Sequence, residues 1–353
     1  MIRVAVIGTG SMGRNHARVY SELAEAELVG IADADHKVLM KAEQDFGVPG
    51  FADFRQMLEA LQPQAVSVAV PTAMHEAVAQ AVLESGANVL VEKPIAATLE
   101  QGTRLIDCAE KHRRLLMVGH IVRFNPAIQA LKNKLQNGEL GRIYQITARR
   151  VGPFPARIRD VGVVIDLATH DLDLIRYLTG LEPLQVYAET EQRIHTDHED
   201  LLLGMLRLPG DVSALLEINW LTPTKVREVS VLGERGLFRV DDLTQDLYFY
   251  ENEMAVSGSA QPNQEDQEVP AFLRTSGRVL WSNLQNIKGV SEGSMTRYAL
   301  QRYEPLKAEL QAFLRAVIEG VPPPVSGEDG LTALRLALAL VKSGQRHQVI
   351  QLS

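Results

Sequence analysis

Lys93, Asp166 and His170 are the residues of this chain whose side chains together suit the oxidation of an alcohol. A histidine, with an unperturbed pKa of about 6.5, takes up a hydroxyl proton around neutral pH. A lysine ammonium hydrogen-bonds the reacting oxygen and stabilises the negative charge that develops there. Asp166 and His170 are four residues apart, so on a helix they share one face and the carboxylate can orient the imidazole. We therefore predict that these three residues are catalytic.

Each of these residues also has an ordinary structural interpretation. Lys93 stands between Glu92 and Pro94 and could be a surface lysine paired with Glu92. The proline restricts Lys93 to an extended backbone, and the peptide bond between them can be cis. Asp166 and His170 could form a pair on a solvated helix face. Asp173 continues their stripe and leaves a metal site open, but we predict none, because hydride transfer to a nicotinamide needs no metal.

The chain begins with a glycine-rich turn, Gly8-x-Gly10-x-x-Gly13, between a short apolar run and a helical segment. Glycines there allow a tight turn and let the backbone approach a pyrophosphate, which sits on the helix N-terminus. Asp33 follows 20 residues later, where a carboxylate accepts hydrogen bonds from ribose hydroxyls and repels a 2′-phosphate, so NAD is favoured over NADP. The alternatives are a plain turn and a helix-capping Asp33. The predicted cofactor contacts here are Gly8, Gly10, Ser11, Met12, Gly13 and Asp33.

The elements that must position these residues alternate along the first third of the chain. Apolar runs at 4–7, 28–32, 65–70, 89–91 and 115–118 read as strands, and segments 13–23, 37–46, 54–61, 75–85 and 99–112 have helical spacing. Strands that alternate with helices predict a parallel sheet covered on both faces. Lys93 then lies just past the carboxyl end of a strand, where open α/β sheets bind ligands.

The texture changes after residue 119. Helices are predicted at 126–136 and 163–178, a strand at 143–150, and several short strands between 184 and 250, with turns at 208–211 and 233–236. Residues 251–297 read as a long loop, and helices at 305–319 and 330–343 follow. We predict an α/β protein with a Rossmann NAD-binding domain, 1–119. An α+β domain for substrate binding and oligomerisation, 120–353, carries a mostly antiparallel open sheet.

Composition excludes several classes of partner. A net charge of −8 over 353 residues argues against nucleic acid and membrane surfaces, which are polyanionic. Cys108 is the only cysteine, so no internal disulfide is possible and a zinc–thiolate cluster is not expected. No uncharged apolar segment reaches about 18 residues, so a soluble, cytoplasmic protein is predicted. The His- and Asp-rich run 195–200 is interpreted as a solvated connection.

Four motifs in order resemble one known family. Gly8-x-Gly10-x-x-Gly13, Pro71-Thr72-x-x-His75, Glu92-Lys93-Pro94 and Asp166-x-x-x-His170 together resemble the Gfo/Idh/MocA oxidoreductases. The resemblance implies a Rossmann domain followed by an α/β domain whose open sheet often forms a subunit interface, and hence a homo-oligomer. It implies NAD as cofactor, with His170 as the base. It adds further cofactor contacts, namely Pro71, Thr72, His75, Glu92 and Lys93.

Within that family, the stretch from Arg149 to Asp166 is similar to UDP-N-acetylglucosamine 3-dehydrogenases. These enzymes oxidise the sugar 3-hydroxyl to a ketone that an aminotransferase converts to a 3-amino sugar. Residues 141–159 hold five arginines and no acid, which suits the diphosphate of a nucleotide-sugar. The expected substrate contacts are Arg123, Asn125, Arg149, Arg150, Arg157, Arg159, Asp166, His170 and Trp220.

Four alternatives stay open. Any one of the arginines could face solvent, and Trp220 could fill the interior between sheet and helix. The substrate could be an inositol or a free sugar. The chain could also be a non-catalytic regulator that binds NAD, although such a protein has no need of all three predicted catalytic residues.

Overall fold

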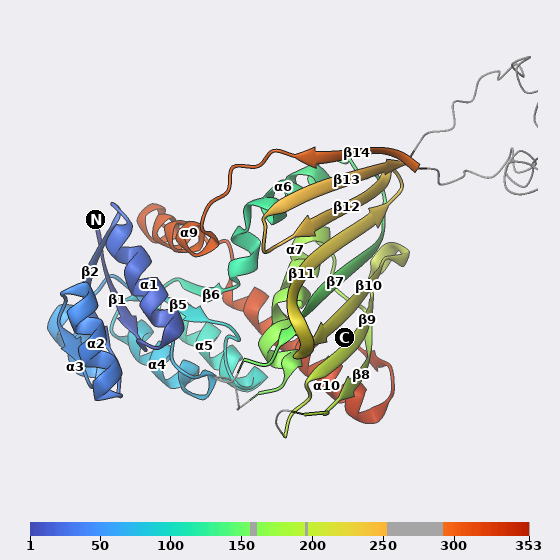
Figure 1. Cartoon of the computed structure of the whole chain (residues 1–353). Helices are drawn as coiled ribbons and strands as arrows, with labels where there is room; N and C mark the ends of the chain where they lie inside the picture. Colours follow the sequence, from blue (N-terminus) through green and yellow to red (C-terminus); the bar gives the residue numbers. More distant parts are fainter. Residues whose placement is uncertain (156–160, 195–196, 253–291, 353) are drawn as a thin grey trace, which may run out of the picture.

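The computed structural model describes residues 1–155, 161–194, 197–252 and 292–352 and contains two sheets (Figure 1). The first sheet has six parallel strands in the order β3-β2-β1-β4-β5-β6. Its strands are β1 (Ile2–Ile7), β2 (Ala26–Ala32), β3 (Gly50–Phe51), β4 (Ala65–Val68), β5 (Asn88–Glu92) and β6 (Leu116–Gly119). Its helices are α1 (Ser11–Glu22), α2 (His36–Phe46), α3 (Phe54–Leu61), α4 (His75–Glu84) and α5 (Leu99–His112). The predicted parallel sheet is confirmed.

The strand order of this sheet creates a binding crevice. The chain winds one way from β1 to β3 and the other way from β1 through β4 to β6, so the topology reverses between β1 and β4. In such sheets ligands bind outside the carboxyl ends of the strands at the reversal. The strand β3 was not predicted, because two residues are too short to show a period.

The second sheet has nine strands in the order β14-β13-β12-β11-β7-β10-β9-β8-β15. Its pairs are antiparallel except β7 with β10. Its strands are β7 (Ile143–Pro153), β8 (Gln185–Glu191), β9 (Leu201–Arg207), β10 (Ser213–Asn219), β11 (Leu221–Gly233), β12 (Gly236–Asp241), β13 (Asp246–Asn252), β14 (Glu292–Tyr298) and β15 (Ile350–Gln351). The long loop predicted at 251–297 is therefore wrong at its ends, which are strand, and its middle, 253–291, lies outside the described residues.

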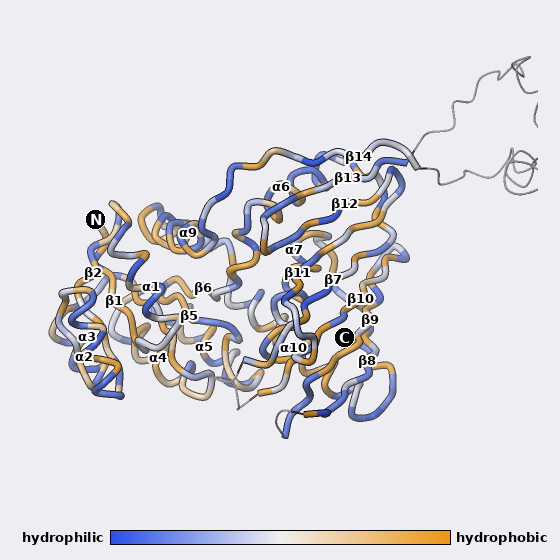
Figure 2. Tube along the Cα trace, in the orientation of Figure 1, coloured by the Kyte–Doolittle hydropathy of each residue, from blue (hydrophilic) through white to orange (hydrophobic). Residues whose placement is uncertain are grey.

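Helices α6 (Pro126–Gln136), α7 (Thr169–Thr179) and α10 (Gly327–Arg346) pack on one face of the nine-stranded sheet (Figure 1). Apolar residues run along these strands (Figure 2), and in β9 and β10 buried positions alternate with more exposed ones, so the apolar side chains that face the helices are buried. The helix predicted over 163–178 is divided, because Val164–Ala168 forms one π-helical turn before α7 begins. Among the described residues, no helix is both long and apolar enough to cross a membrane.

The last two helices join the two sheets. Helix α9 (Pro305–Glu319) places Leu310 and Phe313 in the hydrophobic core of the first sheet, although it lies far beyond residue 119 in the chain. Helix α10 packs against α5 and β6 as well as α7 and β8. A Cβ at Gly330 would lie 2.6 Å from the side chain of Val118, so the helix approaches β6 closely. A cut at residue 119 would therefore separate the first sheet from part of its own core.

Candidate active site

A cleft with a cavity volume of about 1150 Å³ lies between the carboxyl edge of the first sheet and the π-helical turn before α7. This exceeds the roughly 300–1,000 Å³ of ordinary small-molecule sites, so it has room for a dinucleotide beside a substrate. The predicted catalytic residues and most of the predicted cofactor contacts line it: Gly8, Gly10, Ser11, Met12, Asp33, Pro71, Thr72, His75, Glu92, Lys93, Asp166 and His170.

The glycine-rich turn has the geometry that a pyrophosphate requires. Gly8 has a φ of +86°, and a Cβ at Gly13 would lie 1.7 Å from the carbonyl oxygen of Gly8, so Gly13 packs beneath the turn instead of facing the cleft. At Gly10 a Cβ would meet no atom within 4 Å. Gly10 also makes no side-chain cap, and the first turn of α1 holds no acidic residue. The amides of this helix N-terminus are left to receive an anion.

Asp33 is held on the cleft wall by local hydrogen bonds. Its Oδ2 accepts from the backbone of Thr9 at 2.6 Å, and its Oδ1 accepts from the backbone of Asp35 at 2.9 Å. The cap of α2 is Asp35, whose carboxylate accepts from Lys37, so the alternative that Asp33 is a helix cap is wrong. The fixed carboxylate fits the ribose hydroxyls of NAD and opposes a 2′-phosphate.

The turn that carries Lys93 is braced from below by His75. The Lys93–Pro94 peptide bond is cis. His75 is buried, with Nδ1 2.8 Å from the carbonyl oxygen of Pro94 and Nε2 3.0 Å from that of Val70. Burial lowers the pKa of His75. We therefore assign His75 the support of this turn as well as a place on the cleft wall.

The three predicted catalytic residues meet in the cleft, although their contacts differ from those expected. The Nζ atom of Lys93 donates to both the carbonyl oxygen of Asp166, at 2.7 Å, and its Oδ1, at 2.9 Å. No hydrogen bond joins Asp166 to His170 in the described part of the chain, so the predicted orientation of the imidazole by this carboxylate is corrected. A π-helical turn is wider than an α-helical one, so residues four apart across it no longer stack. Asp166 orients Lys93 instead.

His170 is held in its neutral form. Burial lowers its pKa well below the usual range, and the positive charges of Lys93 and Arg150 lower the pKa further. Its Nδ1 is sealed in the interior without a hydrogen-bond partner among the described residues, which leaves Nε2 for the cleft. A neutral imidazole facing a cleft is ready to accept a proton.

His120 is a neighbour of the base that sequence reasoning missed. Its ring is buried and lies edge-on to that of His170, with 6.3 Å between the ring centroids. Neither of its ring nitrogens has a hydrogen-bond partner in the described structure. The signal was present, because His120 directly follows β6 as Lys93 follows β5, and the strand-end rule applies to both.

The two described arginines from the predicted substrate stretch do not line the cleft. Arg149 and Arg150 are consecutive in β7 and so point to opposite faces of the sheet. Arg149 is exposed on the outer face and pairs with Glu217 at 2.9 Å. Arg150 is buried and binds the carboxylate of Asp171 through two nitrogens, at 2.7 and 2.9 Å. Arg157 and Arg159 lie outside the described residues.

Three further expected substrate contacts have interior partners. The guanidinium of Arg123 is buried against Asp173, with Nε 2.7 Å from Oδ2. This pair also separates Asp173 from the metal site considered with Asp166 and His170. Asn125 and Trp220 are also buried. Asn125 caps α6 and donates to the carbonyl oxygen of Asp242. Trp220 is 2% exposed and packs edge-on against Phe154, so it fills the interior.

The run 195–200 is only partly as expected. His195 lies outside the described residues. Asp200 is fully buried and accepts from the backbone of Arg193 and Ile194, so a solvated connection is wrong at this residue. Its neighbour Glu199 accepts from the backbone of Val164 at the start of the π-helical turn. The segment therefore supports the wall of the cleft that carries Asp166.

Arg227 is a cation near the base for which the sequence offers no signal. It lies opposite Arg150 in the register of β11 and β7 and donates to the carbonyl oxygen of Val151 at 2.7 Å. It forms no ion pair with a carboxylate among the described residues. Burial and the charge of Arg150 lower its pKa to about 10. Besides burial, the charges of Lys93, Arg150 and Arg227 lower the pKa of His170.

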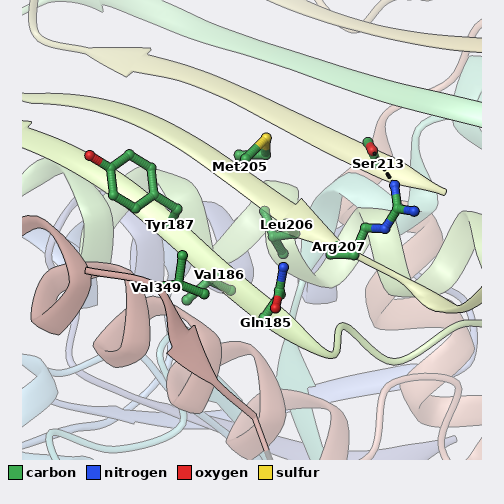
Figure 3. A pocket seen from close by; sticks show the side chains of 8 residues that line it. All are labelled: Gln185, Val186, Tyr187, Met205, Leu206, Arg207, Ser213 and Val349. Carbon is green, nitrogen blue, oxygen red and sulfur yellow. Dashed lines mark hydrogen bonds between the residues drawn. The ribbon is translucent and has the colours of Figure 1, made fainter. Parts of the chain in front are cut away.

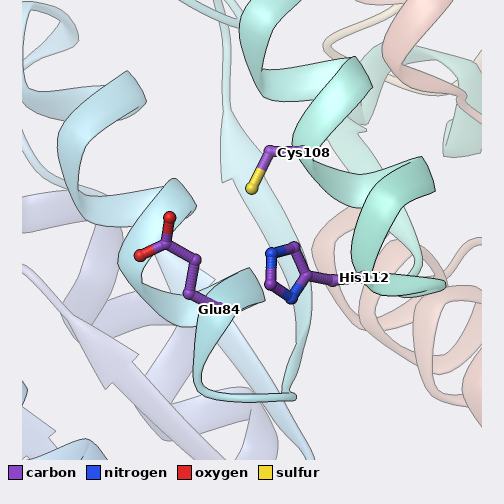
Figure 4. Close-up of side chains that lie close together, drawn as sticks. All are labelled: Glu84, Cys108 and His112. Atoms are coloured by element: carbon purple, nitrogen blue, oxygen red, sulfur yellow. The ribbon is translucent and has the colours of Figure 1, made fainter.

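Metal-ligand spacing occurs elsewhere in the described structure. Donor atoms of Glu84, Cys108 and His112 lie within 4.8 Å of one another on α4 and α5 (Figure 4). None of the three lines the cleft. The group is distinct from the site described here, and its chemistry is not needed for a hydride transfer.

Comparison with known proteins agrees with the geometry. Residues 2–120 match the family model described as the Gfo/Idh/MocA oxidoreductase family with an NAD-binding Rossmann fold, and residues 128–239 match the Gfo/Idh/MocA C-terminal domain. The chain is 29% identical over 337 residues to UDP-N-acetylglucosamine 3-dehydrogenase of Acidithiobacillus ferrooxidans, which covers 96% of this chain and 95% of that protein. It is 28% identical over 364 residues to myo-inositol 2-dehydrogenase of Thermotoga maritima, with 99% and 98% covered.

A solved structure extends the comparison to three dimensions. The structure of the Acidithiobacillus ferrooxidans UDP-N-acetylglucosamine 3-dehydrogenase superposes with a TM-score of 0.81 at 27% identity, over 98% of both chains. The matching folds, the two family models and the cleft with its dinucleotide-binding turn lead to one conclusion. This chain belongs to the Gfo/Idh/MocA family of oxidoreductases and is an NAD-dependent dehydrogenase.

Proposed function

We propose that the chain oxidises a secondary hydroxyl of a nucleotide-sugar, namely the 3-hydroxyl of a UDP-N-acetylhexosamine, to the keto sugar. The observation that carries the proposal is the convergence of Lys93 and His170 on the cleft that begins at the dinucleotide-binding turn. The similarity to UDP-N-acetylglucosamine 3-dehydrogenase over nearly the whole chain supports this choice of substrate.

The donors of Lys93 define its role in the reaction. An ammonium group has three N–H donors, and Asp166 takes two of them with its carbonyl oxygen and Oδ1. The third remains for the oxygen of the substrate hydroxyl. Lys93 thus stabilises the negative charge that develops on this oxygen, and Asp166 fixes the direction in which the ammonium points.

His170 acts as the base. Its Nε2 accepts the hydroxyl proton, because Nδ1 is sealed in the interior. Bound NAD supplies the acceptor for the hydride that leaves the carbon of the same CH–OH group. The positive charges of Lys93, Arg150 and Arg227 favour both a neutral imidazole before the reaction and an anionic oxygen during it.

The anionic part of the substrate needs cationic partners other than the buried arginines. Arg227 is one candidate, because its guanidinium lies near the base and is not neutralised by a carboxylate ion pair among the described residues. Arg157 and Arg159 remain predictions. Arg149 and Arg150 are not proposed to contact the substrate directly, because they form ion pairs with Glu217 and Asp171.

A second candidate substrate is a free polyol such as myo-inositol. It is favoured by the full-length similarity to myo-inositol 2-dehydrogenase and by the carboxylate partners that the structure gives to Arg123, Arg149 and Arg150. A polyol carries no diphosphate and would need no cluster of free guanidiniums.

NADH formation with parallel substrates tests the proposal. UDP-N-acetylglucosamine, N-acetylglucosamine, UDP-glucose and myo-inositol would each be incubated with the full chain and NAD. Turnover of UDP-N-acetylglucosamine with no turnover of the free sugar supports a diphosphate-dependent enzyme. Turnover of myo-inositol alone assigns the second candidate. An absence of NADH with all four, from protein that binds NAD, would revive a regulatory role.

We also infer that the enzyme is a homo-oligomer joined through the second sheet. Within the described residues no element covers its outer face (Figure 1), which exposes Leu203, Met205, Leu215, Leu232 and Met295. Figure 3 shows a hollow on this face where Tyr187 and Arg207 stand beside Met205. Large exposed apolar areas mark interaction sites, and an open sheet pairs readily with a second copy. A cytoplasmic location stays a prediction.

A further inference from the structure

A buried chain of hydrogen bonds connects helix α1 to the residue before Lys93. His16, which is fully buried on α1, has Nε2 3.0 Å from Oε1 of Glu92 and Nδ1 3.0 Å from Oγ of Ser67. The same Oγ is 2.8 Å from the hydroxyl of Tyr20. The four side chains belong to α1, β4 and β5. The proposed chemistry uses neither His16, Tyr20 nor Ser67.

When Glu92 is ionised and His16 is neutral, the donors and acceptors of this chain run in one direction. A carboxylate can only accept, so His16 donates from Nε2. A neutral imidazole then accepts at Nδ1, so Ser67 donates to it and Tyr20 donates to Ser67. Burial raises the pKa of Tyr20, which keeps the phenol a donor. Every polar group in this interior chain is satisfied, and losing one partner is costly there.

The carboxylate of Glu92 is seated closely at the end of β5. A Cβ on Gly119 in β6 would lie 3.3 Å from its carboxyl carbon and from both oxygens, so a larger residue there would displace the carboxylate by a few tenths of an ångström. Its Oε2 accepts from the backbone amide of Lys93 at 3.2 Å. Glu92 therefore touches the catalytic turn on one side and His16 on the other.

The charged groups around Glu92 favour its ionised form. Burial raises the pKa of Glu92, but the hydrogen bond and the electrostatic attraction of His16, together with the charge and the backbone amide of Lys93, outweigh burial, and the net pKa is lowered. On α9, Glu309 is fully buried without a partner in the described structure, and burial together with the charge of Glu92 raises its pKa well above the usual range. This shift favours the protonated form of Glu309, and no hydrogen bond joins Glu309 to His16 in the described structure.

We propose that His16 is a positioning residue for Lys93. Through Glu92 it ties the backbone of the catalytic turn to α1, whose N-terminus is placed to receive the cofactor's diphosphate. A shift of α1 is then transmitted to the turn that carries the ammonium, so the cofactor site and Lys93 are coupled. This inference rests on the proposed function for the role of Lys93, but its test needs no sugar substrate.

The test compares NAD dissociation constants of full-length variants with those of the wild type between about pH 6 and pH 9. His16→Phe keeps a ring of similar size but removes both nitrogens, whereas His16→Gln keeps one donor within reach of Glu92. Without its donor, Glu92 is left buried and its pKa rises, so it takes up a proton as the pH falls. The variant-to-wild-type ratio of dissociation constants should exceed unity across the range, because the bond to Glu92 is lost at every pH, and it should rise to roughly tenfold at pH 6 as Glu92 becomes protonated.

Two further variants keep the test decisive. Tyr20→Phe is the matched control, because it removes a buried hydroxyl but leaves the bonds among Ser67, His16 and Glu92 intact; its ratio should not change with pH. Ser67→Ala removes the donor to Nδ1 and should show the trend of His16→Phe more weakly, which decides the matter if His16→Phe does not fold.

Two outcomes would overturn the proposal. One is a ratio for His16→Phe that stays near unity at every pH, which would mean that His16 only fills space. The other is a His16→Gln variant as pH-dependent as His16→Phe, which would mean that the donor to Glu92 is irrelevant. Neither outcome bears on which sugar is oxidised, so the proposed function stands or falls separately on the substrate panel.

Discussion

Replacing Arg150 with methionine separates a structural arginine from a ligand-binding one. The side chains of Arg150 and Asp171 are 7% and 1% exposed, and two nitrogen–oxygen contacts of 2.7 and 2.9 Å join them. Methionine retains most of the apolar stem and removes the guanidinium. Asp171 is then left buried without its cation, a change that costs about 3–5 kcal/mol of unfolding free energy.

Arg149→Met is the matched control. The two arginines are neighbours in β7, but Arg149 and its partner Glu217 are 47% and 42% exposed. Water screens such a pair, so its loss should cost less than about 1 kcal/mol. Urea unfolding followed by circular dichroism measures both variants under the same conditions.

The pH profile of the reaction supplies a second readout for Arg150→Met. Arg150 is one of the charges that lower the pKa of His170, so its removal raises that pKa. Because the base must be unprotonated, the acidic limb of kcat/KM should move to higher pH. A variant as stable as wild type, with an unmoved acidic limb and a greatly raised KM for a nucleotide-sugar, would refute the structural assignment and restore Arg150 as a substrate contact.

The remaining predictions concern catalysis, cofactor binding and assembly. Lys93→Met should lower kcat by about 100-fold or more with little change in NAD affinity, since the ammonium acts on the reacting oxygen. Stopped-flow turnover measures the first effect and NAD titration the second. Near-normal turnover would contradict the role of Lys93. Gly13→Ala should abolish NAD binding or folding, because its Cβ would lie 1.7 Å from the carbonyl oxygen of Gly8. Thermal unfolding with and without NAD measures both effects. Normal NAD binding would exclude the close packing of Gly13 and Gly8. Met205→Asp and Leu215→Lys together should dissociate the oligomer, measured by light scattering, whereas an unchanged mass would place the interface elsewhere.

Local rules predicted five of the six strands of the first sheet, all but β3, and the residues at its carboxyl edge. The glycine-rich turn, Asp33 and Lys93 each follow a short apolar run, and such runs form the buried parallel strands. The same rule would have found His120 after β6, had it been applied there. The three residues predicted to be catalytic line one cleft, because the family motif and the strand-end rule indicate the same place, and their roles stay a prediction.

Other features depended on contacts that no local pattern encodes. The alternation of β7 shows that Arg149 and Arg150 face opposite sides, but their carboxylate partners come from β10 and α7. The spacing of α9 is that of any amphipathic helix, and only its packing shows that it completes the first core. The expected contact between Asp166 and His170 does not form among the described residues. The carboxylate of Asp166 accepts instead from Lys93, 73 residues away, and the π-helical turn changes the spacing of Asp166 and His170.

The amino-acid sequence by itself determined the periodicities, the turns and the side chains able to bind a dinucleotide and move a proton, since these depend on neighbours a few residues apart. Tertiary structure alone decided which charges are buried together. Arg150 is paired with Asp171, Glu92 is held by His16 across 76 residues, and burial together with the charges of Lys93 and Arg150 lowers the pKa of His170. The physical reason is that desolvation and Coulomb interactions depend on distance in space, which the order of residues along the chain does not specify.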